Sequence, residues 1–193
     1  MKKIILLTLL LCQTLSGMAQ NADFQKVVEK YKNATTMTAK VTKSLHRSAV
    51  KDDMVTTGTL EMKKPAHVCI SIDGGKDMLL MEGSAFTMVA GGRKQKTTSE
   101  GNPQFATFQA VFEAILAGGG DLSKYADLNI NRQGSDLVLT ITPQAANKKQ
   151  QRRIMFTSLV LTIDARTSAM KSLRLNDKRG NYTNYEFTNF AFK

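Results

Sequence analysis

Short segments in which apolar and polar residues alternate at every second position make up most of this chain. Met37, Ala39 and Val41, for example, alternate with threonine and lysine. A period of two indicates a β-strand with one sheltered face, and turn-forming runs such as Asp73-Gly74-Gly75 separate the segments. The pattern predicts about ten consecutive antiparallel strands, within residues 37–45, 54–62, 66–72, 78–81, 86–89, 128–131, 136–142, 154–164, 168–176 and 182–192.

Two segments instead follow the three- and four-residue spacing of a helix. The first lies near residues 23–32, and its apolar residues are Phe24, Val27, Val28 and Tyr31. The second covers residues 104–117 and ends at a run of three glycines. Its apolar residues are Phe105, Phe108, Val111, Phe112, Ile115 and Leu116. We therefore expect a mainly β (α+β) domain, an incomplete, highly curved antiparallel β-barrel with two or three helices covering an apolar cavity.

The first nineteen residues have the pattern of a cleavable secretory signal peptide. Lys2 and Lys3 precede an apolar run over residues 4–11, and small residues stand at Gly17 and Ala19. The run is much shorter than the roughly 20 residues that span a bilayer. Residues 1–19 are thus predicted to be removed, leaving residues 20–193 as one exported, soluble, periplasmic domain. Leu11 before Cys12 does not suit lipoprotein processing, so no lipid anchor is expected.

The net charge of +11 raises the question of an anionic partner. An exported protein rarely meets nucleic acid, and no aromatic residues interleave the basic runs near residues 93–96 and 147–153 as base stacking would require. Nucleic acid is therefore not expected as a partner. The basic residues fit either solvated loops or attraction to an anionic membrane surface or headgroup.

Residues that usually perform catalysis are scattered along the chain. His46 and His67 lie on different predicted strands and have no metal-ligand spacing, so neither a metal site nor a cofactor is expected. Ser84 and Cys69 could serve an esterase as nucleophile, but no histidine and acid are placed by the sequence to activate them. We therefore predict that the protein is not an enzyme.

Methionines occur at several positions that the alternation places on the sheltered face. Met37, Met62 and Met88 are three of them. Methionine adapts to irregular apolar space, which suits a cavity for flexible chains. A core that is simply rich in methionine would show the same pattern, and both interpretations stay open at this point.

Three motifs, taken together after an export signal and an amphipathic helix, resemble those of the outer-membrane lipoprotein carrier family, which is called LolA-like. They are Gly58-Thr59-Leu60-Glu61-Met62-Lys63-Lys64-Pro65, Glu82-Gly83-Ser84-Ala85-Phe86, and the run Leu175-Asn176-Asp177-Lys178-Arg179-Gly180-Asn181-Tyr182-Thr183. The similarity extends over nearly all of residues 20–193. In the family, an arginine stands where this chain has Lys64, before the proline.

The resemblance implies an incomplete barrel, closed by helices, that encloses the acyl chains of lipoproteins and shuttles them from the inner to the outer membrane. An inner-membrane ABC transporter and an outer-membrane acceptor would be the partners, and the carrier would act as a monomer. The second helix would be the lid, and its six apolar residues would line the cavity together with Met37, Met62 and Met88 of the barrel. Lys64 would tether the lid. Two alternatives remain, a carrier of another amphiphilic lipid and a lipid-sensing envelope module that acts through a partner protein.

Overall fold

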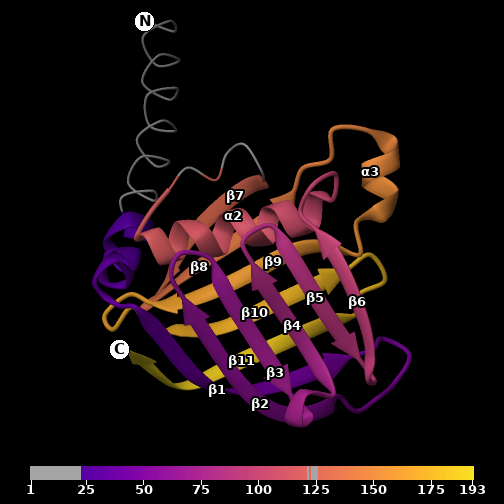
Figure 1. The fold of residues 1–193 in the computed structure, drawn as a ribbon, viewed down its shortest axis with the longest axis horizontal. Helices are drawn as coiled ribbons and strands as arrows, with labels where there is room; N and C mark the ends of the chain where they lie inside the picture. The colour runs from indigo at the N-terminus through magenta and orange to yellow at the C-terminus, as the bar shows by residue number, and fades with distance from the viewer. Residues whose placement is uncertain (1–22, 121, 123–125) are drawn as a thin grey trace, which may run out of the picture.

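The computed structural model describes residues 23–120, 122 and 126–193 (Figure 1). The predicted signal peptide at 1–19, with Cys12, lies outside the described residues. Within the described part, no helix is both long and apolar enough to cross a membrane.

One antiparallel sheet of eleven strands forms the domain, in the order β6-β5-β4-β3-β2-β1-β11-β10-β9-β8-β7. The pairing of β1 with β11 joins the first and last strands of the described residues at the middle of the sheet. The strands are β1 (Thr36–His46), β2 (Met54–Lys63), β3 (His67–Ile72), β4 (Asp77–Glu82), β5 (Ala85–Ala90), β6 (Arg93–Thr98), β7 (Ala126–Gln133), β8 (Asp136–Pro143), β9 (Phe156–Asp164), β10 (Met170–Asp177) and β11 (Tyr182–Phe192). β6 and β7 are the two edges, so the barrel is incomplete, and the predicted fold class is confirmed.

The alternation in the sequence corresponds to burial on the concave face. In β3, Val68, Ile70 and Ile72 are buried while the residues between them are half-buried. Gly58 lies between Val41 and Ile72 in the register of β1, β2 and β3. A Cβ there would come within 1.9 Å of the Ser71 carbonyl oxygen, so only glycine fits this close approach of β2 to β3.

Helical segments lie on the concave side and at one end of the sheet. Residues 23–28 form a helix that continues into the 3-10 turn η1 (Glu29–Asn33). Helix α2 (Pro103–Ala117) crosses the open side from near β6 to the first helical segment (Figure 1). Two shorter segments are η2 (Asp73–Gly75) and α3 (Lys148–Arg153).

Two elements differ from the sequence-based expectations. β6 is exposed and basic and shows no apolar alternation. It forms a strand because its backbone pairs with the edge of β5. The basic run at 147–153 was expected to be a loop, but its residues 148–153 form α3. The side-chain oxygen of Asn147 accepts a hydrogen bond of 2.9 Å from the Gln150 N–H and so caps the helix.

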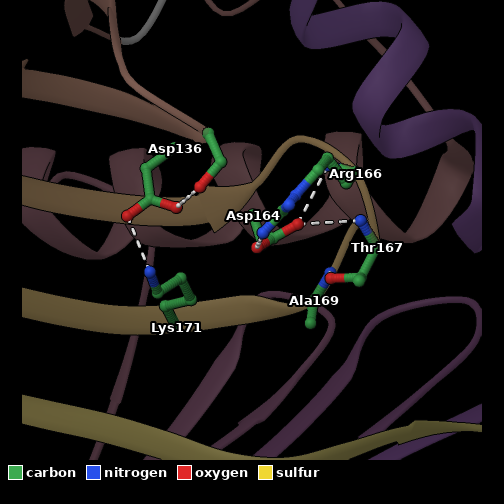
Figure 2. A network of polar contacts seen from close by, with 7 residues as sticks. Asp136, Asp164, Arg166, Thr167, Ala169 and Lys171 are labelled. Carbon is green, nitrogen blue, oxygen red and sulfur yellow. Dashed lines mark hydrogen bonds and ion pairs between the residues drawn. The ribbon is translucent and has the colours of Figure 1, made fainter.

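A network of polar contacts orders the turn between β9 and β10 (Figure 2). Asp164 accepts hydrogen bonds from the backbone N–H groups of Arg166 at 2.9 Å and Thr167 at 2.8 Å. These bonds, above all that from Thr167, lower the pKa of the Asp164 carboxyl. The buried hydroxyl of Tyr31 donates a 2.8 Å hydrogen bond to the Ser168 carbonyl, which fixes the first helical segment to this turn.

Candidate ligand-binding cleft

An apolar cleft of about 240 Å³ lies between α2 and the concave face of the sheet. Ile70, Leu79 and Met88 are direct neighbours across β3, β4 and β5 and form one wall. Phe105 and Phe108 of α2 form another, and Phe86 packs against both at centroid distances of 4.7 and 6.0 Å. The remaining lining residues are Lys43, Ile72, Asp77, Met78, Val89, Ala90, Met155, Phe156, Leu175 and Tyr185.

One side of the cleft carries a fixed ion pair. Lys43 Nζ lies 2.7 Å from Asp77 Oδ2, and the Gly91 N–H donates to Asp77 Oδ1 at 2.9 Å. The hydrogen bond from Lys43 is the main reason that the pKa of Asp77 is lowered. Tyr185 faces Lys43 in the register of β1 and β11, and burial raises its pKa to about 12. These groups are therefore already paired or held neutral, and the rest of the lining is apolar.

A more polar groove of about 590 Å³ continues from the cleft. The two spaces share Met155, Phe156 and Leu175 as lining residues. Met155 is 60% exposed at this junction. This groove was not predicted from the sequence, because its polar residues stand mostly in segments that resemble solvated turns.

The nine residues that were predicted to form the cavity and lid fall into two groups in the structure, those that line the cleft and those in the core. Phe105, Phe108 and Met88 come together in the lining of the cleft. The other six are buried in the core, away from the lining: Val111, Phe112, Ile115, Leu116, Met37 and Met62. The C-terminal half of α2 packs against the concave face of the sheet, so its apolar residues belong to the hydrophobic core.

Lys64 makes a bond of the kind expected of a tether, although not to α2. Its Nζ donates a hydrogen bond to the carbonyl of Lys32, near the end of η1. The side chain of Lys32 in turn lies against Gly118, which caps the C-terminus of α2 with a left-handed φ of 74°. Lys64 therefore contacts the first helical segment, and that segment contacts the end of α2.

The side chains considered for catalysis are not arranged as a catalytic group. Within the described residues, no hydrogen bond joins Cys69 or Ser84 to a histidine. Burial raises the pKa of the Cys69 thiol, which disfavours the reactive thiolate. His46 Nδ1 instead lies 2.7 Å from Asp53 Oδ1. The described part of the chain also holds no group of three or more acidic, histidine or cysteine side chains arranged for a metal ion.

No family model matches the sequence, and no curated protein matches it either. Several solved structures are similar at low identity. A DUF1329 family protein from Desulfovibrio piger has a TM-score of 0.46 and 10% identity, and the match covers 89% of this chain and 92% of that one. A LolA superfamily protein from Nitrosomonas europaea has a TM-score of 0.41 and 9% identity, covering 89% and 92%.

An outer-membrane lipoprotein-sorting protein domain from Vibrio parahaemolyticus has a TM-score of 0.42 and 10% identity, covering 86% of this chain and 89% of that one. LolA-superfamily and lipoprotein-sorting proteins are thus among the structural neighbours.

Proposed function

We propose that this protein is a non-catalytic periplasmic carrier that binds an acyl chain of a lipoprotein in the apolar cleft. It receives its cargo from an inner-membrane ABC transporter and delivers it to an acceptor at the outer membrane as a monomer. The observation that supports this proposal is the lining of the cleft, where α2 and the strands contribute apolar side chains around two groups that already neutralise each other.

The energetic need for such a cleft is large. Exposing an acyl chain of about sixteen carbons to water costs on the order of 12 kcal/mol, at roughly 0.8 kcal/mol per methylene. A carrier that moves through water must offer apolar surface of comparable extent. Phe105 and Phe108 are almost fully buried, so a long chain enters only if α2 moves away from the strands.

The size of the cleft favours a second candidate, a carrier of an amphiphile with a single chain. Its volume of about 240 Å³ is slightly below the roughly 300–1,000 Å³ of most small-molecule sites. One chain, extending into the adjoining groove, fits this space with a smaller movement of α2 than two or three chains would need. Mass spectrometry of the lipid that co-purifies from the native envelope distinguishes the two candidates.

Transport itself is tested with a labelled lipopeptide moving from donor to acceptor vesicles. The wild-type protein should increase the rate of transfer in proportion to its concentration. Met88→Glu places a charge in the cleft and should abolish the increase, whereas Thr87→Glu adds the same charge to β5 at a position that does not line the cleft. A wild-type rate equal to that of buffer alone would refute the carrier function.

A further inference from the structure

The polar groove continues directly from the apolar cleft, so one ligand can occupy both. Met155, Phe156 and Leu175 line the two spaces together. An amphiphile has the same division, with an apolar chain joined to a polar head. A chain in the cleft can therefore place its head in the groove.

Every second residue from Val41 to Arg47 leads from the core through the cleft to the groove. Val41 is buried, Lys43 lines the cleft, and Leu45 and Arg47 both line the groove, with Arg47 directly after the last residue of β1. These residues are two positions apart, and side chains of a strand with that spacing share one face. The groove is thus an extension of the concave face of the sheet, and Arg47 adds a positive charge to its lining.

The charge of the groove is set by two arginines and one acid. Arg47 and Arg179 line it, and no hydrogen bond or salt bridge joins either guanidinium to a described residue, although the charge of Arg179 contributes to lowering the pKa of Asp177. Asp177 is the one acidic lining residue, and its carboxylate is already occupied by the turn between β10 and β11. It accepts from the backbone N–H of Arg179 at 2.6 Å and from the backbone and side-chain N–H of Asn181 at 2.9 and 2.6 Å.

The two arginines are held on segments that contact each other. The backbone N–H of Ser48 donates to Asn181 Oδ1 at 2.9 Å, and Ser48 Oγ donates to the Arg179 carbonyl at 3.3 Å. The loop that carries Arg47 is therefore joined to the turn that carries Arg179. Two arginines that line one groove on joined segments are a suitable arrangement for an oxyanion, which each guanidinium can bind through paired N–H donors.

We propose that this groove binds the phosphate of an anionic amphiphile, with Arg47 and Arg179 as its ligands, while the acyl chain occupies the cleft. This inference rests on the second candidate function, a carrier of a single-chain amphiphile, and adds the class of its headgroup. A phosphate is favoured over the carboxylate of a fatty acid because the groove, at about 590 Å³, has room for a polar part much larger than one carboxylate.

Calorimetric titration with two single-chain lipids of equal length tests the proposal below their critical micelle concentrations. Lysophosphatidylglycerol carries a phosphate, and monoacylglycerol is uncharged. The wild-type protein should bind lysophosphatidylglycerol at least tenfold more tightly. The double variant Arg47→Gln/Arg179→Gln should reduce this preference to less than threefold and leave the affinity for monoacylglycerol unchanged.

A matched control removes two charges elsewhere. Lys94 and Lys96 are exposed on the edge strand β6 and line neither space, so Lys94→Gln/Lys96→Gln should keep the tenfold preference. Equal loss in both double variants would mean that overall charge attracts the lipid, and would overturn the headgroup site.

The remaining outcomes separate this proposal from the carrier function. Binding of both lipids with equal affinity would refute the headgroup site and leave lipid binding intact. Binding of neither lipid would refute both. Inorganic phosphate is titrated as well, and if it bound as tightly as lysophosphatidylglycerol, the groove would be a free-phosphate site independent of the cleft, which would also overturn the proposal.

Discussion

Lys43 Nζ and Asp77 Oδ2 lie 2.7 Å apart on the concave side of the sheet and join β1 to β4. β2 and β3 lie between these strands in the sheet, so the ion pair spans its curve. The side chains are 16% and 35% exposed, and the pair is therefore partly shielded from water. It stands at the boundary of the cleft and satisfies the one lysine that interrupts the apolar face of β1.

A double-mutant cycle measures what this ion pair contributes. Lys43→Met and Asp77→Asn should each lower the free energy of unfolding by about 1–2 kcal/mol, because each leaves a partly buried polar group without its partner. The double variant should lose less than the sum of the two, with a coupling of about 1 kcal/mol. Urea unfolding of the four proteins checks this, and strictly additive losses would show that the pair contributes nothing.

Stability should also depend on pH through Asp77. Its pKa is lowered in the folded protein, mainly by the hydrogen bond from Lys43, while the pKa of an aspartate in an unfolded chain is about 3.9. The stabilisation is therefore present above the unfolded pKa and is lost as the pH falls through the lower folded value. Between about pH 6 and pH 3, wild type should lose more stability than Asp77→Asn. Parallel losses in the two proteins would contradict the assignment.

The bond from Lys64 to the Lys32 carbonyl should hold the first helical segment in place. Lys64→Leu removes the donor, so hydrogen exchange in residues 29–34 should become faster, and the open form of the lid should become more populated. Release of a labelled lipopeptide to acceptor vesicles, followed by stopped flow, should then be faster than in wild type.

Lys63→Leu is the control for that experiment, because Lys63 is exposed and its Nζ pairs with Glu61 at 2.8 Å, away from the helices. Lys64→Arg keeps a donor and should retain slow release. Exchange and release rates equal to those of wild type in Lys64→Leu would show that the bond has no part in lid control.

Much of the fold follows from local patterns in the sequence, while the site depends on long-range geometry. Alternation at every second residue predicts most of the sheet, and the spacing of Phe105 and Phe108 predicts α2. Alternation cannot predict β6, whose partner strand rather than its own composition makes it a strand. It also cannot separate a cavity from a core, since Met37 and Met88 have the same pattern but only Met88 lines the cleft.

The sequence carries only a weak signal for the groove. Arg47 continues the two-residue spacing of Val41, Lys43 and Leu45, which places it on the concave side, but a basic residue just beyond a strand resembles any solvated turn. Arg179 lies more than a hundred residues later, and only the pairing of β1 with β11 brings the two together. No local pattern in the sequence predicts that these two arginines line the same groove.

The central claim, that the cleft binds an acyl chain, is tested most directly by titrating a fluorescent fatty acid into wild type, Met88→Glu and Thr87→Glu. Far-UV circular dichroism of all three should agree, because both substituted residues are only half-buried. We expect saturable binding to wild type and to Thr87→Glu with affinities within about twofold, and at least tenfold weaker binding to Met88→Glu, since a charge in the cleft opposes burial of the chain. Unchanged affinity in a folded Met88→Glu protein, or no saturable binding to wild type, would contradict the claim.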